Sequence, residues 1–355
     1  MNKMFILYTC EKCGKEFTLK QSYKSHLERK TPCKRKIPEN CIIPMLVPEN
    51  ESISAFPTPS AKMIITEEST KTIIEATKTE KPKPVYLSIL NKHERDKNIS
   101  FDEGPHIYDI NGDKTFMSCT TWVHSHFPHF DSTTIINNIL NNPKYKTDPT
   151  YKYYGMTKEA ILQSWDKNRD SASTSGTNMH FYIECYYNGI DIGDNSTEYK
   201  YFMEFLADHS NLEPYRTEWC VYYEEIKISG SIDMVFRDKI TGEYHIYDWK
   251  RVKSIEYEAF KNETALTEPI KHLPNSNFWI YSLQLNTYKA ILEAKYGMRI
   301  NDLYLICIHP DNPKKTYEKI KCHDLSKEIQ ELFELRKGEI LNQTNKFLKD
   351  EGVSN

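Results

Sequence analysis

The sequence predicts an α/β protein, with a mixed central sheet flanked by helices, and two observations carry that prediction. Residues from about 91 to 350 alternate between strand-like and helix-like patterns, which is typical of a globular α/β domain. The composition, 39% hydrophobic and 27% charged over 355 residues, is sufficient for one sizeable core and something smaller. We therefore expect one large domain, preceded by a short N-terminal part of different composition.

The expected elements of the large domain follow one another along the chain. A strand pair within 106–121 turns at the Asn-Gly dipeptide of positions 111 and 112. Helices are expected near 131–142, 156–168, 176–188, 277–296 and 326–348. Strands are expected near 216–237, 243–251 and 302–310, the first of them long enough to be broken once.

The segment GSIDMVFRDKITGEYHIYDWKR predicts a β-hairpin, because two runs rich in Ile, Val, Phe, Tyr and Trp flank a polar segment with one Gly. A turn centred near Ile240 and Thr241 places Asp233 opposite Asp248. Asp248 and Lys250 are two residues apart, so both side chains leave the same face of the strand.

Two carboxylates directly opposite each other destabilise a sheet unless something neutralises them. A divalent cation between Asp233 and Asp248 would do so, and Mg²⁺ accepts two carboxylates, a backbone carbonyl and one further ligand while keeping several waters. Lys250 beside the metal would activate a water or stabilise the charge on a pentacovalent phosphate. The spacing Asp-x14-Asp-x-Lys thus predicts metal-assisted phosphodiester hydrolysis.

These residues resemble the motif II and III core of the PD-(D/E)XK nuclease superfamily. The run SGTNMHFYIECYYNG resembles the G-T-x-x-H-x-x-x-E helix of RecB-like nucleases, in which the His binds a metal; here it is His180. Glu218 lies on the strand before the hairpin, where the family often has an acid. SLQLNTYKAILE supplies a Gln-x3-Tyr motif as Gln284 and Tyr288, which share one helix face.

The segment HIYDINGDKTFMSCTTWVHSHF is similar to the one that begins the mitochondrial genome maintenance exonucleases, a RecB-like branch, so the resemblance covers most of residues 101–310. It implies a restriction-endonuclease-like fold and Mg²⁺ or Mn²⁺ held by His180, Asp233, Asp248 and the carbonyl of Trp249. It further implies a catalytic set of Asp233, Asp248, Lys250, Glu218, Gln284 and Tyr288. The expected substrate is DNA, cleaved from an end or a single strand to leave a 5′-phosphate, in replication, repair or recombination.

The N-terminal part, residues 8–36, predicts a ββα zinc finger. Its ligands would be Cys10, Cys13, His26 and Cys33, in the spacing Cys-x2-Cys-x12-His-x6-Cys. A bound Zn²⁺ would supply folding free energy that so short a chain cannot obtain from a core. Residues 1–40 hold ten Lys or Arg and four Glu, a net charge of +6, so any nucleic-acid contact there should be salt-sensitive. Nucleic-acid tethering and protein contact are both open.

A disordered linker is expected over 37–90, because seven of the seventeen prolines fall between positions 37 and 84, among Ser, Thr, Glu and Lys. The fusion of such a finger to such a nuclease resembles proteins of large eukaryotic DNA viruses. Nine cysteines are an odd number and several stand singly in apolar runs, which favours a reducing compartment, cytoplasm or nucleus, including that of a virus-infected host cell.

Several classes of function are disfavoured. No run of about 18 apolar residues is present, so no membrane span is expected. The net charge of −3 argues against a uniformly basic nucleic-acid coat, and the absence of G-x4-G-K-[ST] argues against a motor. Two alternatives stay open: a catalytically silent nuclease fold that binds nucleic acid, and an adaptor whose principal function lies in the zinc finger.

Overall fold

The computed structural model describes residues 8–9, 16–17, 86–102, 104–190 and 194–350. The chain divides into two units, Met1–Pro82 and Lys83–Asn355. In the first unit, β1 (Tyr8–Thr9) pairs antiparallel with β2 (Glu16–Phe17). Outside the described residues lie most of the predicted linker and all four predicted zinc ligands, namely Cys10, Cys13, His26 and Cys33.

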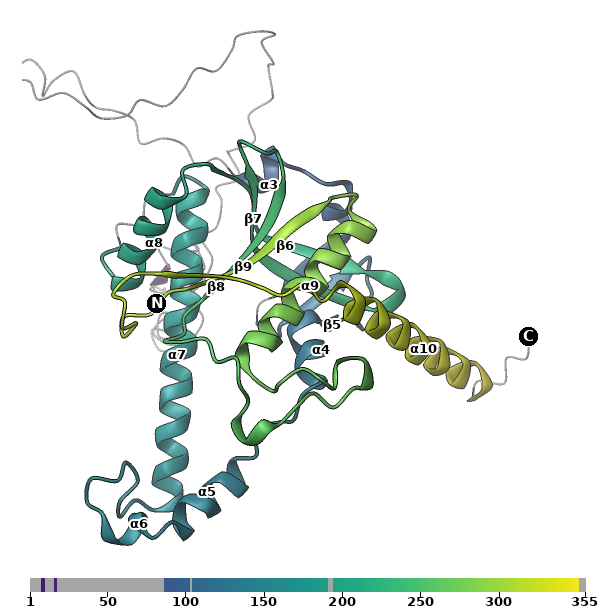
Figure 1. The fold of residues 1–355 in the computed structure, drawn as a ribbon. Helices are drawn as coiled ribbons and strands as arrows, with labels where there is room; N and C mark the ends of the chain where they lie inside the picture. The colour runs from purple at the N-terminus through teal and green to yellow at the C-terminus, as the bar shows by residue number, and fades with distance from the viewer. Residues whose placement is uncertain (1–7, 10–15, 18–85, 103, 191–193, 351–355) are drawn as a thin grey trace, which may run out of the picture. The chain divides into compact units, whose positions relative to one another are not determined.

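The second unit contains a mixed six-stranded sheet flanked by helices, as the sequence predicts (Figure 1). The order is β10-β9-β8-β7, with β6 and β5 also paired to β7. β8 runs parallel to β9 and β5 runs parallel to β7, whereas the remaining pairs are antiparallel. The strands are β5 (Met117–Ser118), β6 (Leu212–Tyr223), β7 (Ile228–Asp238), β8 (Tyr244–Lys250), β9 (Ile300–Cys307) and β10 (Glu318–Lys321).

One edge of β7 carries a gap in its pairing. β6 occupies the other edge along almost the whole strand, so β5 and β8 must share the remaining one. β5 pairs with β7 as far as Ser229, and β8 pairs with it only from Met234 onward. Within the described part of the chain, the positions between them, 230–233, therefore have no strand partner on this edge, and backbone groups and side chains can converge there.

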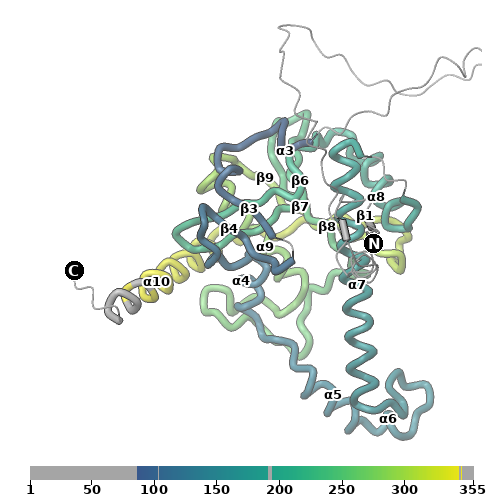
Figure 2. The backbone as a smooth tube through the Cα atoms, turned by 180° about the vertical axis from the view of Figure 1, so that it is seen from behind, coloured from purple at the N-terminus to yellow at the C-terminus, as the bar shows by residue number. Residues whose placement is uncertain are grey.

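Helices cover both faces of the sheet. Met179 of α7 and Phe202 of α8 pack with Trp249 in the core of one face, whereas Trp122 of α4, Leu285 of α9 and Phe333 of α10 pack in the core of the other. The helices are α4 (Cys119–Ser125), α7 (Lys158–Tyr187), α8 (Thr197–Asp208), α9 (Asn277–Lys295) and α10 (Ser326–Asp350). Only the C-terminal half of α7 lies beside the sheet; its N-terminal half extends away and meets α5 (Ser132–Asn141) and α6 (Lys144–Thr147) in both views (Figures 1 and 2).

The prediction of a strand pair within 106–121 is wrong, although the predicted turn is present. Asn111 and Gly112 have positive φ angles of 52° and 89°, as an Asn-Gly turn requires, but only one isolated bridge, Ile110 to Asp113, follows. β4 (Ile107–Ile110) pairs instead with β3 (Ile99–Asp102), and the downstream segment becomes β5 of the main sheet. The turn residues determine the local bend but not which strand pairs across it.

The expected helices 156–168 and 176–188 are one continuous helix, α7, of 30 residues. The intervening RDSASTSG run has low helix propensity and suggests a break. The helix nevertheless continues through this run. The hydroxyls of Thr174, within the run, and Thr177, directly after it, donate hydrogen bonds to backbone carbonyls four residues earlier. Helices α4 and α8 and strand β10 are also present and were not expected from the sequence.

Other short elements complete the second unit. They are α3 (Leu87–Leu90), at the end of the predicted linker, and the 3-10 turns η2 (Glu94–Asn98), η3 (Glu224–Ile226), η4 (Phe260–Asn262) and η5 (Glu268–Ile270). Across the described part of the chain, no helix has the length and apolar character needed to cross a bilayer.

Candidate active site at the gap beside β7

The predicted hairpin is present with the predicted register. The β7–β8 ladder runs from Arg237 opposite Tyr244 to Met234 opposite Tyr247, which makes Asp233 and Asp248 the next opposing pair. The backbone ladder stops there. In its place, the amide N–H of Trp249 donates a 2.9 Å hydrogen bond to Oδ2 of Asp233. The carboxylate thus substitutes for a backbone acceptor where the strands diverge.

Asp248 and Lys250 leave the same face of β8 and form an ion pair. Nζ of Lys250 lies 2.6 Å from Oδ2 of Asp248, and the two side chains are 18% and 3% exposed. The contact is close but not aligned as a hydrogen bond, so within the described residues this buried oxygen accepts none. The ammonium also lies 4.6 Å from the ring centroid of Tyr281 on α9. Lys250 is therefore held between an acid and an aromatic face.

A second group of side chains gathers on the other side of Asp233. Ligand atoms of His180, Glu218 and Asp233 all lie within 4.8 Å of one another. Nδ1 of His180 is 3.5 Å from Oδ2 of Asp233 and 3.7 Å from Oε1 of Glu218. Three elements contribute one residue each, α7, β6 and β7, so the group exists only in the folded chain. Its donor set, one imidazole and two carboxylates, is one that divalent cations accept.

Glu218 reaches this group through an unusual backbone. Its φ angle is 43°, in the left-handed region, although it lies in the middle of β6 and is not glycine. The cross-strand register places it opposite Asp233, between the pairs Thr217–Met234 and Trp219–Ile232. Oγ of Ser231 donates a 2.9 Å hydrogen bond to Oε2 of Glu218. Strain of this kind is concentrated at functional sites, where the surrounding structure enforces it.

The ionisation of these groups shows how strongly they interact. Burial alone lowers the pKa of His180, but the carboxylates of Asp233 and Glu218 outweigh it and raise the pKa to about 9. Burial and the negative charge of Asp248 raise the pKa of Asp233, against the opposing effect of His180. Burial lowers the pKa of Lys250, but Asp248 and Asp233 raise it above its ordinary value. With its pKa raised, the His180 imidazole is protonated at neutral pH in the absence of a metal. A bound dication would displace that proton, and it would then neutralise the net charge of −2 that three carboxylates and one ammonium leave.

Gln284 and Tyr288 lie one helical turn apart on α9 and face the same region. Nε2 of Gln284 lies 3.5 Å from Oη of Tyr288 and 3.4 Å from Oγ1 of Thr120. Tyr288 is 3% exposed and packs against Gly230 of β7. The Gln-x3-Tyr pair therefore borders the site from the α9 side.

Trp249 has two separate roles in the structure. Its amide holds Asp233, as described above, whereas its indole is 2% exposed and packs edge-on against Phe202 and Phe205 of α8. The ring is thus a core residue. The metal-binding role predicted for its backbone carbonyl stays a prediction.

The structure brings the predicted residues together, but with a different grouping. Glu218, expected among the catalytic residues, joins His180 and Asp233 in the group that could bind a metal, whereas Asp248 pairs with Lys250. Two neighbours were missed by sequence reasoning. Tyr281 precedes Gln284 by three residues and Ser231 precedes Asp233 by two, so helix and strand periodicity would have placed both on the same faces.

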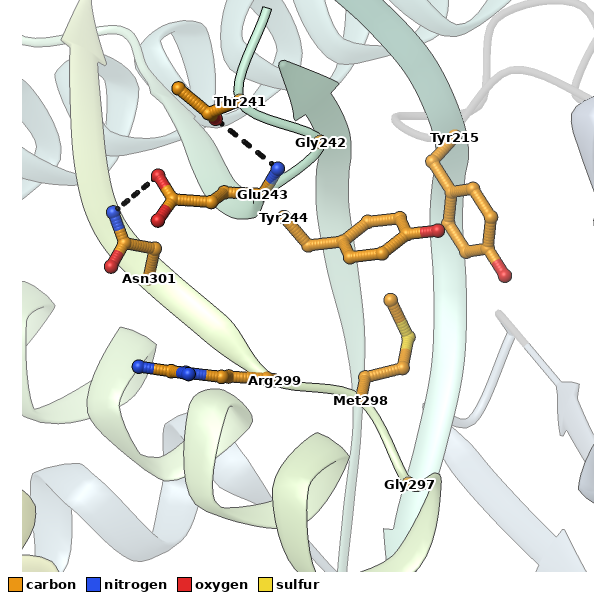
Figure 3. Close-up of a pocket in the computed structure, with 9 residues that line it drawn as sticks. All are labelled: Tyr215, Thr241, Gly242, Glu243, Tyr244, Gly297, Met298, Arg299 and Asn301. Carbon is orange, nitrogen blue, oxygen red and sulfur yellow. Dashed lines mark hydrogen bonds between the residues drawn. The ribbon is translucent and has the colours of Figure 1, made fainter. Parts of the chain in front are cut away.

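A pocket at the other end of β8 contains none of these residues (Figure 3). It has a volume of about 410 Å³ and lies between the β7–β8 turn and the start of β9. There the carboxylate of Glu243 accepts a hydrogen bond from the amide of Asn301, and the backbone N–H of Glu243 donates one to Oγ1 of Thr241. Since β8 rises about 3.3 Å per residue, this pocket lies roughly 20 Å from Lys250 and is separate from the candidate site.

Comparison with known proteins adds no assignment, since the chain matches no protein-family model and no curated protein.

Proposed function

We propose that this protein is a metal-dependent nuclease that hydrolyses phosphodiester bonds in DNA, acting from an end or on a single strand. The observation that carries the proposal is the meeting of His180, Glu218 and Asp233 beside the Asp248–Lys250 ion pair at one gap in the sheet. The mixed sheet flanked by helices is compatible with a restriction-endonuclease-like fold. The order His, Glu, Asp, Asp-x-Lys and Gln-x3-Tyr along the chain supports the PD-(D/E)XK, RecB-like assignment.

The donor set fits a divalent cation. Oxygen atoms of Glu218 and Asp233 and a ring nitrogen of His180 are already gathered, and Oδ2 of Asp248, which forms an ion pair with Lys250, accepts no aligned hydrogen bond within the described residues. Carboxylates suit Mg²⁺ and Mn²⁺, and the imidazole makes Mn²⁺ at least as suitable as Mg²⁺. When bound, such a cation would polarise a phosphoryl oxygen and lower the pKa of a bound water.

The chain's own residues would divide the remaining work. Lys250, held by Asp248 and the ring of Tyr281, would orient the attacking water and stabilise negative charge that develops on the phosphate. Asp233, fixed by the amide of Trp249, would keep its carboxylate turned toward His180 and Glu218. Gln284 would position the substrate from the α9 side with an amide that reaches toward Tyr288 and Thr120.

The N-terminal unit is proposed to be a zinc finger on a linker. β1 and β2 form an antiparallel pair, compatible with the ββ part of such a finger. Zn²⁺ bound by Cys10, Cys13, His26 and Cys33 would supply its stability. Its contact would be either DNA, favoured by the net charge of +6 over residues 1–40, or a protein partner.

The test compares the full-length protein with Asp248→Ala, Asp233→Asn and a finger-disrupting Cys10→Ser/Cys13→Ser variant. Each is incubated with end-labelled linear and circular DNA, in Mg²⁺, in Mn²⁺ and in EDTA. We expect the wild type and the finger variant to degrade linear DNA with metal only, and both acidic-site variants to be inactive. Binding of DNA by the wild type without any cleavage in either metal would indicate a silent nuclease fold and refute the proposal. Loss of every activity in the finger variant would indicate an adaptor.

A further inference from the structure

A cavity of about 930 Å³ borders the candidate site and contains none of the residues assigned to it. It is lined by α5, by the end of α4 and the connection between α4 and α5, by the segment that follows β8, by Tyr151 after α6, and by one residue of the first turn of α9. The α4–α5 connection and the segment after β8 lie at the same end of the sheet in both views (Figures 1 and 2). The volume lies within the range of pockets that bind small organic groups.

Two phenylalanines on different segments leave their rings open at this cavity. Phe130 is 70% exposed and Phe260 is 74% exposed. The ring of Phe130 is held edge-on by Trp165 of α7 at a centroid distance of 5.7 Å, and the ammonium of Lys261 lies 5.3 Å from the ring of Phe260. One exposed apolar side chain is ordinary, but two open rings lining the same cavity form a stacking surface.

The polar lining of the cavity suits a neutral, planar group with donors and acceptors at its edge. Asn138, Asn142 and Asn275 contribute side-chain amides, each of which has more than one hydrogen-bonding position. Asn275 uses one to donate to Glu263, and Asn142 uses one to accept from the amide of Lys144. Asp131 and Glu263 also line it against one lysine, Lys261, so the lining has no excess of positive charge with which to hold a bare phosphate. Aromatic faces together with amides are the groups that recognise nucleobases in unpaired strands.

The position of the cavity relates it to the candidate site. Ile280 lines the cavity. The next residue is Tyr281, and the ammonium of Lys250 lies 4.6 Å from the centroid of its ring. His124 also lines it, and burial followed by the positive charge of Lys250 lowers the pKa of His124. The cavity therefore borders the site on the Lys250 side.

We propose that this cavity is a nucleobase pocket, which holds one unpaired base of the substrate strand while Phe130 and Phe260 stack on it. The proposal rests on the proposed nuclease function and adds a substrate requirement to it. A base inside a duplex is stacked and paired, so it would have to leave the helix before entering the pocket. The pocket thus selects a strand that is single-stranded at the position beside the scissile phosphate.

The experiment measures binding without cleavage. Fluorescence anisotropy of a labelled single-stranded oligonucleotide, in EDTA and at fixed salt, is recorded for the full-length wild type, Phe260→Ala, Phe130→Ala and the double variant. Leu266→Ala is the matched control, because Leu266 is 60% exposed on the same segment and does not line the cavity. The same series is repeated with a single abasic site moved along the strand.

We expect each phenylalanine variant to bind the intact strand about five- to tenfold more weakly, as loss of one stacking contact implies, and the control to bind like the wild type. An abasic site at one position should weaken wild-type binding similarly, and at that position Phe260→Ala should cause no further loss. Equal binding by all variants, or a loss that adds to the abasic effect at every position, would overturn the pocket. Because the assay excludes metal, a base-dependent pocket in a protein that never cleaves DNA would refute the nuclease proposal alone.

Discussion

Tyr288 of α9 lies so close to Gly230 of β7 that position 230 has no room for a residue with a β-carbon. A β-carbon at position 230 would lie 2.7 Å from both Cε1 and Oη of Tyr288, and 3.1 Å from Cβ of Cys119. The Gly in GSID is therefore a packing requirement of the predicted site. It admits the tyrosine of the Gln-x3-Tyr motif against β7 beside the positions that, among the described residues, have no strand partner on the edge shared by β5 and β8.

Gly230→Ala should destabilise the protein by about 1–3 kcal/mol, the usual cost of overpacking a core. Chemical denaturation followed by fluorescence would measure it. Tyr288→Leu in the same chain removes the ring that clashes, so the double variant should lose less than the sum of the two single changes. Strict additivity would show that the two residues are not in contact.

Glu218→Gly should separate backbone strain from metal binding. The φ angle of 43° costs a residue with a β-carbon roughly 1–2 kcal/mol, which glycine does not incur. Glu218→Ala is the matched control, because it also removes the carboxylate but keeps the β-carbon. We expect the Gly variant to be about 1 kcal/mol more stable than the Ala variant by denaturant midpoint, and both to bind Mn²⁺ more weakly than the wild type. A more stable Ala variant would contradict the left-handed backbone.

Lys250→Met should separate catalysis from metal binding. If Lys250 activates water and stabilises the phosphate, its removal should lower the cleavage rate by about 10³-fold or more while Mn²⁺ affinity by calorimetry is kept. Asp233→Asn should lower both. The Met variant should also be less stable, because Asp248 is left buried and unpaired. Cleavage by Lys250→Met within tenfold of the wild type would remove the lysine from the mechanism.

His180→Asn should change the choice of metal. Imidazole favours later transition metals over Mg²⁺, whereas an amide oxygen does not discriminate in this way. We expect Mn²⁺ affinity to fall by at least about tenfold and Mg²⁺ affinity to fall less. Titration calorimetry with each metal measures both. An equal loss for both metals would contradict the predicted change in preference, and unchanged affinity for both would place His180 outside the coordination shell.

Lowering the pH should reduce the free energy of unfolding, in part through protonation of Asp96 of η2. Its Oδ2 lies 2.7 Å from Nη1 of Arg216, which is buried, and its Oδ1 accepts a 2.9 Å hydrogen bond from the indole of Trp219. Burial opposes ionisation, but these hydrogen bonds lower the pKa of Asp96 below its usual 3.8. A lowered carboxyl pKa stabilises the fold above pH 3.8, and this contribution is lost as the pH falls through the folded-state value.

Asp96→Asn should therefore cost about 2–4 kcal/mol at pH 7, because Arg216 loses its ionic partner. The difference from the wild type should stay constant down to about pH 4 and then narrow. Denaturation curves at several pH values test this. A difference that widens below pH 4 would reverse the assigned direction of the pKa.

The sequence determined the hairpin and its register. Alternating apolar residues and a polar turn placed Asp233 opposite Asp248 and put Lys250 on the same face as Asp248, and the structure has this arrangement. Such features depend on periodicity and turn chemistry within about 20 residues of chain. The helices α5, α9 and α10 and the strand β9 were predictable for the same reason.

Tertiary structure decided what periodicity cannot encode. Local periodicity does not show that α7 continues through the largely exposed RDSASTSG run, or that Ile107–Ile110 pairs with β3. The grouping of Glu218 with His180 required a left-handed residue within a strand and a helix from elsewhere in the chain. The sequence alone thus specified which chemical groups are present. Long-range packing set the distances between them, and therefore the local negative charge that a cation would have to balance.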